Sequence, residues 1–229
     1  MEQWSAYYLS QLGRFERQNA SLSGGGGERI VFVGDSLVQN FPLGRLLPGR
    51  EWFNRGIAGD GVGAYRPEAP HRGLAARWGA SVLAVRPQAL FVLVGTNDMT
   101  LPGGGPQRTL RDLEELLAET KRRLPACRLC LHTLPPAGLA RLDSGLFNTA
   151  AEDFNAGIAA LAARLAAELI DLWVLFRGDD GLLQERFTGD GVHLTAEAYD
   201  VWAGEVARVL ERWDSPAPDA PAGNRNLRA

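Results

Sequence analysis

The chain has little of what marks several classes of protein. Two cysteines among 229 residues are too few for a disulfide framework. The longest apolar runs, such as residues 89–94, fall far short of the ~20 residues of a membrane-spanning helix. The first residues, MEQWS, are neither basic nor apolar enough to open a signal peptide. We therefore expect a cytoplasmic protein with no membrane span.

Neither sign of charge dominates the chain. Lys and Arg number 24 and Asp and Glu 27, so the net charge is −3, and nothing electrostatic predicts a nucleic-acid partner. Three scattered histidines without an H-E-x-x-H motif argue against a dedicated metal site. With 45% apolar and 22% charged residues, the composition is that of a globular domain and excludes disorder, collagen and coiled coil.

Cys127 and Cys130 form a C-x-x-C motif. A redox pair places its first sulfur at a helix N-terminus, but this pair opens an apolar run with strand character, and no second pair completes a zinc site. Buried strand thiols are the better interpretation.

Short apolar runs alternate with longer segments of helical period. The runs predict strands at residues 29–33, 51–55, 89–94, 128–133 and 168–172. Helices are predicted at residues 74–85, 109–124, 154–165 and 195–213, the last with Thr195 as N-cap, and the spacing of Tyr8, Leu12 and Phe15 adds a short helix at the start. This alternation predicts an α/β fold with a doubly wound parallel sheet.

Composition predicts one domain over residues 1–213. Residues 1–28 supply the first helix and a Gly-rich link, Gly24–Gly27, which precedes a strand and so is not a phosphate-binding loop. Residues 214–229 are rich in proline and poor in apolar residues, and we expect a disordered tail.

Polar residues follow the predicted strands, at the edge where open α/β sheets bind ligands. Ser36 follows the first strand, Gly59 the second and Asn97 the third, while His193 precedes the last helix. A serine hydroxyl needs a base within hydrogen-bond reach, and histidine, with an ordinary pKa near 6.5, suits that task. Asp190, three residues before His193, can orient the ring.

An ester's tetrahedral intermediate also needs donors for its oxyanion. The backbone N–H groups of Ser36 and Gly59 and the side-chain amide of Asn97 are the candidates. Each of these segments alone could be a turn or a helix cap, but their order and their places at strand ends favour catalysis. His71 and His132 are weaker candidates for the base because neither has an acidic residue three or four positions away.

The segments Gly34-Asp35-Ser36-Leu37, Gly59-Asp60, Gly95-Thr96-Asn97-Asp98 and Asp190-x-x-His193 together resemble the four motifs of the SGNH hydrolases, or GDSL esterases. The resemblance spans about residues 29–213 and looks closest to platelet-activating-factor acetylhydrolase-like members. It implies a three-layer α/β/α flavodoxin-like fold with a five-stranded parallel sheet. It also implies Ser36 as nucleophile, His193 as base, Asp190 as its partner, and Gly59 and Asn97 as oxyanion donors.

The chain departs from the family pattern beside the proposed oxyanion hole. Family members often have Thr or Ser where this chain has Gly61, and the segment 62–72 is longer and richer in Pro and Arg than usual. These departures bear on the shape of the substrate entrance.

The expected function is that of a serine esterase that forms a covalent acyl-enzyme and needs neither cofactor nor metal. Its partner is a small acyl ester: short-chain esters, sugar acetates, lysophospholipids and thioesters all remain open, as does the oligomeric state. The loops 60–72, 99–106, 135–149 and 178–188 are expected to set specificity, with Leu101, Leu146, Phe147 and Phe187 as candidate pocket residues. A catalytically silent binding module and a flavodoxin-like nucleotide binder are the alternatives, although Asp35 would repel phosphate.

Overall fold

The computed structural model describes residues 2–22, 27–63, 73–100, 103–138 and 144–215. The strands are β1 (Arg29–Gly34), β2 (Glu51–Gly56), β3 (Ala89–Leu93), β4 (Arg128–His132) and β5 (Glu168–Ile170). The α-helices are α1 (Glu2–Ala20), α2 (Ser36–Gln39), α3 (Leu43–Leu46), α4 (Leu74–Trp78), α5 (Pro106–Arg123), α6 (Ser144–Leu165), α7 (Leu172–Phe176) and α8 (Ala196–Asp214). A π-helical turn, η1 (Gly79–Leu83), continues α4, and a 3-10 turn, η2 (Glu185–Phe187), lies between α7 and α8.

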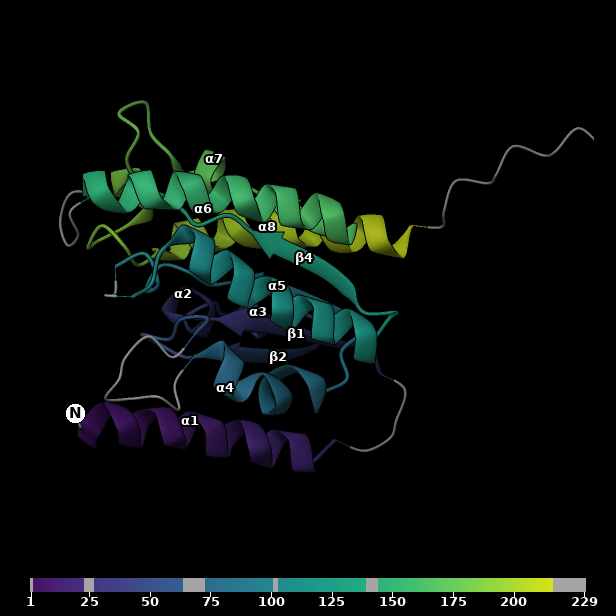
Figure 1. Cartoon of the computed structure of the whole chain (residues 1–229). Coiled ribbons are helices and arrows are strands. Elements are labelled where there is room, and N and C mark those ends of the chain that lie inside the picture. Colours follow the sequence, from purple (N-terminus) through teal and green to yellow (C-terminus); the bar gives the residue numbers. More distant parts are fainter. Residues whose placement is uncertain (1, 23–26, 64–72, 101–102, 139–143, 216–229) are drawn as a thin grey trace, which may run out of the picture.

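The five strands form one parallel sheet in the order β2-β1-β3-β4-β5 (Figure 1). The chain runs outward from β1 to β2, then crosses to β3 and continues to the other edge, so the order reverses between β1 and β3. The carboxyl ends of these two strands therefore border the crevice where ligands bind in such sheets. The predicted α/β fold with five parallel strands is confirmed.

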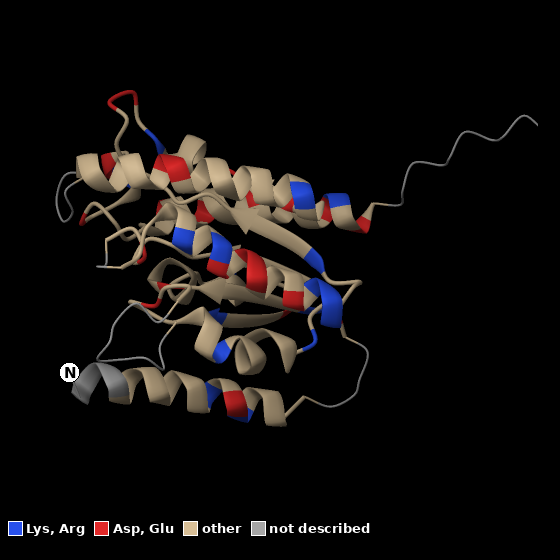
Figure 2. Cartoon of the chain, viewed as in Figure 1, with Lys and Arg blue, Asp and Glu red and all other residues tan. Residues whose placement is uncertain are grey.

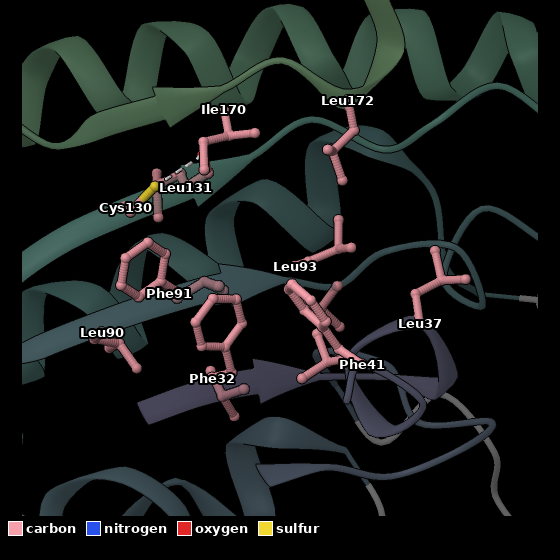
Figure 3. Close-up of a cluster of buried hydrophobic side chains, with 14 of the residues drawn as sticks. Phe32, Leu37, Phe41, Leu90, Phe91, Leu93, Cys130, Leu131, Ile170 and Leu172 are labelled. Atoms are coloured by element: carbon pink, nitrogen blue, oxygen red, sulfur yellow. Dashed lines mark hydrogen bonds between the residues drawn. The ribbon is translucent and has the colours of Figure 1, made fainter. Parts of the chain in front are cut away.

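Helices cover both faces of the sheet. On one face, Trp202 of α8 contacts Phe32 of β1, and Phe32 stacks on Phe91 of β3 with ring centroids 4.5 Å apart (Figure 3). On the other face, α4, η1, α5 and α6 pack side by side, and Trp78 donates a hydrogen bond to Thr120 of α5. β1 and β3 are apolar and buried almost throughout because both faces are covered.

Helix α1 packs on the outside of the helices that cover the second face, beside α4 and η1 (Figure 1). Tyr8 and Phe15 are buried against Ile57 and Leu12 is partly buried, as the spacing of the three predicts. The helix is longer than the short one expected, with 19 residues.

Charges of both signs are interspersed along α5 (Figure 2). The described residues include no helix that is long and apolar enough to cross a membrane. Cys127 and Cys130 are buried free thiols, as predicted, and burial raises the pKa of Cys127 to about 11.

Several element ends differ from the prediction. Helix α6 begins at Ser144 rather than at residue 154, so the expected loop 135–149 is partly helical. Strand β5 stops at Ile170 because Asp171 caps α7, its side chain accepting a hydrogen bond from the amide of Val174. The short helices α2, α3 and α7 were not predicted, since four or five residues carry no readable period. Residues 23–26 and 216–229, the centre of the predicted link and most of the predicted tail, lie outside the described residues.

Candidate active site

Ser36 is the first residue of α2, directly after β1. Asp35 caps this short helix, because its side-chain Oδ1 accepts a hydrogen bond of 2.9 Å from the amide of Leu37. The turn is tight: a Cβ on Gly34 would lie 1.9 Å from the carbonyl oxygen of Leu93, so only glycine fits there. This packing holds Ser36 at the carboxyl edge of the sheet.

His193 reaches Ser36 from the far end of the chain. Its Nε2 lies 3.2 Å from the Ser36 hydroxyl and its Nδ1 lies 2.8 Å from Oδ2 of Asp190. The other carboxylate oxygen of Asp190 accepts the amides of Val192 and His193, which closes a compact turn. Thr188 braces that turn, accepting from the amide of Gly191 and donating to the carbonyl of His193.

The environment keeps Asp190 ionised. Partial burial raises the pKa of this carboxyl, but the hydrogen bonds from the His193 ring and from the amides of His193 and Val192 outweigh burial and hold the pKa well below its usual range. An ionised Asp190 acts on Nδ1 of His193 as a hydrogen-bond acceptor, which leaves Nε2 free to accept a proton from Ser36.

Gly59 follows β2 and Asn97 follows β3, and Asn97 contacts Asp60, the residue after Gly59. Gly59 is exposed, has φ +74° in the turn after β2, and leaves room for a ligand because no atom lies within 4 Å of a Cβ placed on it. Asn97 donates one side-chain N–H to the backbone carbonyl of Asp60 at 2.8 Å, which leaves the other N–H of the amide group for a ligand. Among the described residues, nothing accepts a hydrogen bond from the backbone amide of Ser36 or of Gly59.

A buried ion pair lies beneath these donors. Asp60 and Arg77 have side chains 1% exposed, and Arg77 Nε lies 2.7 Å from Oδ2 of Asp60. The remaining guanidinium N–H groups donate to the carbonyls of Gly34 and Arg55 and to the hydroxyl of Ser81. One side chain thus connects the ends of β1 and β2 to the loop after Gly59.

Two further buried carboxyl groups flank this pair. Burial raises the pKa of Asp98 to about 7, although the amide of Val62 donates to it, and raises the pKa of Asp35 to about 6. A Cβ on Gly61 would lie 2.7 Å from Oδ1 of Asp98, so the glycine that departs from the family pattern gives this carboxyl its space. Most of the unusual segment 62–72 lies outside the described residues.

His132 does not reach this site. His132 is 1% exposed, its ring lies between Phe91 and Trp202, and burial lowers its pKa to about 4. His71 lies outside the described residues. Among the described His, Cys, Asp and Glu side chains, no three are grouped so as to hold a metal ion.

Two cavities are lined in part by residues next in sequence to Ser36, Asp190 or His193, though not by these three residues themselves. The first has about 10 Å³ and is lined by Leu37, Thr96, Pro135, Pro136, Ala137, Phe147 and Val192. The second is a groove of about 310 Å³ lined by Gly138, Asp180, Leu182, Leu183, Glu185, Thr188, Gly189 and Gly191. Of the residues expected to line a pocket, Phe147 does so, whereas Leu146 is 74% exposed and Phe187 is buried against Phe176. Leu101 lies outside the described residues.

Sequence reasoning missed Arg77 and Thr188. Arg77 could have been noticed as the one charge within the otherwise apolar predicted helix 74–85. Thr188, two residues before Asp190, fits the pattern of a hydroxyl that closes a loop by bonding to nearby amides, but such residues are too common to stand out.

Comparisons with known proteins identify the family of the chain. Residues 32–201 match the GDSL-like Lipase/Acylhydrolase family. The chain is 26% identical over 144 residues to a GDSL esterase/lipase from Arabidopsis thaliana, covering 57% of this chain and 46% of that protein. It is 25% identical over 182 residues to the N-acylneuraminate cytidylyltransferase of Escherichia coli O18:K1:H7, covering 80% of this chain and 40% of that protein. The chain thus spans less than half the length of these two curated relatives.

Solved structures share the fold. A GDSL-like lipase from Bacteroides thetaiotaomicron superposes with a TM-score of 0.71 at 21% identity, covering 88% of this chain and 98% of that one. A Streptococcus pneumonia protein with a provisional assignment as a platelet activating factor gives 0.76 at 22% identity, covering 91% and 95%. Because the match to the family covers most of the chain, the resemblance to GDSL esterases is confirmed, and the chain belongs to the GDSL-like Lipase/Acylhydrolase family.

Proposed function

We propose that this chain is a serine esterase that hydrolyses carboxylic acyl esters through a covalent acyl-enzyme. The observation that carries the proposal is the position of the His193 ring, whose two nitrogens lie 3.2 Å from the hydroxyl of Ser36 and 2.8 Å from the carboxylate of Asp190. A nucleophile, a base and a group that orients the base within hydrogen-bond reach are what acyl transfer needs.

The reaction has two halves. In the first, Nε2 of His193 takes the hydroxyl proton, Oγ of Ser36 bonds to the ester carbonyl carbon, and the carbonyl electron pair moves onto oxygen. The oxyanion then collapses, the bond to the alcohol breaks, and the alcohol leaves with the proton from His193. In the second half, His193 takes a proton from water, which attacks the acyl-serine, and the acid is released as Ser36 regains its proton.

The oxyanion formed in each half needs donors that are already in place. The amide of Ser36 and the amide of Gly59 have no competing acceptor among the described residues, and Asn97 has one side-chain N–H remaining. In another serine hydrolase, the loss of one such donor cost about 2.7–4 kcal/mol of transition-state stabilisation. We assign the oxyanion hole to these three groups.

The cavities suggest the kind of ester. The small pocket adjoins the site residues in sequence, since Leu37 follows Ser36, Thr96 precedes Asn97 and Val192 precedes His193. A volume of about 10 Å³ is close to that of one water-sized group, so we propose that the acyl part is as short as acetyl. The larger groove flanks the Asp190–His193 turn and carries two carboxylates, Asp180 and Glu185, so we assign it to the alcohol part and expect a hydroxyl-rich alcohol there.

The test is hydrolysis of p-nitrophenyl acetate by the purified chain. We expect turnover by the wild type, loss of that turnover in Ser36→Ala, and wild-type activity in Ser10→Ala, which changes an exposed serine on α1. A wild-type chain without activity on p-nitrophenyl acetate or butyrate would contradict the proposal. Once turnover is established, a partly acetylated sugar tested beside glycerol triacetate keeps the acyl group constant and compares a hydroxyl-rich alcohol with one that has no free hydroxyl.

A further inference from the structure

The buried Arg77–Asp60 pair lies one hydrogen bond away from a proposed oxyanion donor. Asn97 donates to the backbone carbonyl of Asp60 at 2.8 Å, and among the described residues this is the only hydrogen bond of the Asn97 side chain. The position of that carbonyl therefore sets the direction of the second N–H of Asn97. The contacts that fix the position of Asp60 therefore also fix the proposed donor N–H of Asn97.

Asp60 is held mainly through its own side chain. Oδ1 accepts the amide of Gly73 at 2.8 Å, and Oδ2 accepts Nε of Arg77 at 2.7 Å. The backbone adds one turn bond of 3.2 Å, from the amide of Asp60 to the carbonyl of Ile57, which spans Gly59. The loop that carries Gly59 is thus fixed from one side by Arg77.

Arg77 is itself fixed to the sheet. Its Nη1 donates to the carbonyl of Arg55 at 2.8 Å and its Nη2 to the carbonyl of Gly34 at 3.0 Å, the residues at the ends of β2 and β1. Gly34 also lies two residues before Ser36. A planar guanidinium can serve three acceptors at fixed angles, whereas a lysine ammonium in the same place can keep the charge but not this geometry.

We infer that Arg77 is a positioning residue for the oxyanion hole, acting through Asp60 on Asn97 and Gly59. The inference rests on the proposed function and adds to it a residue that touches no substrate atom. Ion pairs this deeply buried contribute little net stability compared with apolar packing, so stability alone is a weak reason for placing one beneath the site. A positioning role gives the pair a specific purpose.

The experiment is a double-mutant cycle between Arg77→Lys and Asn97→Ala, with p-nitrophenyl acetate as substrate. If Arg77 acts through Asn97, Arg77→Lys lowers kcat about 10-fold in the wild-type background, less than complete loss of a donor would, and leaves KM within about twofold. In the Asn97→Ala background the same substitution lowers kcat by less than about twofold, because the donor is already absent. Asp60→Asn, which keeps an oxygen for the amide of Gly73, is expected to behave like Arg77→Lys.

Arg55→Lys is the matched control. Arg55 is a second fully buried arginine, but its guanidinium contacts Gln18 and Asn19 of α1 rather than Asp60. This variant is expected to lower Tm and leave kcat unchanged. If Arg77→Lys does not fold, the double variant Asp60→Asn/Arg77→Met, which buries no unpaired charge, takes its place in the cycle.

The outcomes separate the inference from the proposed function. An equal loss of kcat in both backgrounds, or no loss in the wild-type background, would overturn the positioning role while the esterase assignment stands. A wild-type chain with no esterase activity would overturn both.

Discussion

At the scale of single residues, the site combines a half-buried pair, Ser36 and His193, with carboxyl groups that are buried beneath it. Asp35, Asp60 and Asp98 lie under the proposed oxyanion hole, and among the described residues only Asp60 of the three has a cationic partner, Arg77. Burial without a partner makes the neutral form of the other two more favourable. The charge state of this cluster therefore depends on pH in a range where most carboxyl groups are already ionised.

Asp98→Asn tests this directly. The pKa of Asp98 is raised by burial to about 7 in the folded chain, against an ordinary value of 3.8. The protonated carboxyl therefore favours folding at low pH, and that contribution is lost as pH rises from about 4 through 7. We expect the free energy of unfolding of the wild type, relative to Asp98→Asn, to fall by about 2–4 kcal/mol between pH 5 and pH 8. Urea unfolding at both pH values measures it, with Glu115→Gln, an exposed change on α5, as control. A difference independent of pH would refute the raised pKa.

The contribution of His132 to the free energy of unfolding has the opposite pH dependence. Its Nδ1 lies 2.9 Å from the carbonyl oxygen of Val92, and burial lowers the pKa of the ring to about 4. Below its ordinary pKa of 6.5 the unfolded chain binds a proton that the folded chain does not, so stability falls as pH drops from 6.5 towards 4. Between pH 7 and pH 5 this costs the wild type about 2 kcal/mol, a loss that we expect His132→Phe to escape. Equal pH slopes for the two proteins would show that the buried ring is not the cause.

At the scale of elements, helix packing decides which side chains the site can use. Helices α5 and α6 lie in close contact, and Gly157 of α6 faces Leu110 of α5. The N-terminal turn of α6 brings Phe147 to the small pocket beside Ser36. The position of one helix against its neighbour thus affects both the core and the proposed acyl pocket.

Two glycine-to-alanine changes separate packing from helix propensity. A Cβ at Gly157 would lie 2.1 Å from Cδ1 of Leu110, whereas a Cβ at Gly204 of α8 would meet no atom within 4 Å. We expect Gly157→Ala to destabilise the chain by about 1–3 kcal/mol through overpacking. Gly204→Ala, in an open helical position, should stabilise it by about 0.5–1 kcal/mol. Chemical denaturation measures both, and changes of the same sign would show that the contact between α5 and α6 is looser than described.

Phe147 is expected to limit acyl length. It is 4% exposed and lines the pocket of about 10 Å³, so a smaller side chain enlarges the space beside Ser36. In Phe147→Leu, and more strongly in Phe147→Ala, the ratio of kcat/KM for p-nitrophenyl butyrate to that for the acetate should rise by about 10-fold. Leu146→Ala, one residue earlier on the same helix and 74% exposed, should leave the ratio unchanged. An unchanged ratio in both Phe147 variants would show that the acyl group does not bind in this pocket.

At the scale of the whole molecule, sequence patterns predict the strands and helices of each layer better than they predict the residues at which these elements begin and end. The buried strands at residues 29–33 and 89–94 could be read because apolar runs of that length between Gly and polar residues have few other interpretations. The start of α6 was missed: Phe147 and Ala151 continue the helical spacing of Phe154, but the glycine and polar residues around them favour a loop.

In the proposed site, too, some features could be predicted from local sequence and others depend on contacts between distant residues. Ser36 and Asn97 could be proposed from their places after strands, because parallel strands bring their carboxyl ends to one edge. His193 could be proposed from its spacing to Asp190, just before the last helix. The Asp60–Arg77 pair could not, because a contact between a loop residue and a residue of helix α4, 17 positions further along the chain, has no local pattern. Nor could the size of the pocket, which depends on how Pro135, Phe147 and Val192 pack together.

The most direct test of the proposed mechanism is to find which atom becomes covalently modified. The wild type and His193→Ala are treated with a fluorophosphonate, and the adduct is located by peptide mass spectrometry. The mechanism predicts a single adduct on Ser36 in the wild type, formed at least about 100-fold more slowly without the His193 base. No adduct, an adduct on another residue, or equal rates in the two proteins would contradict it.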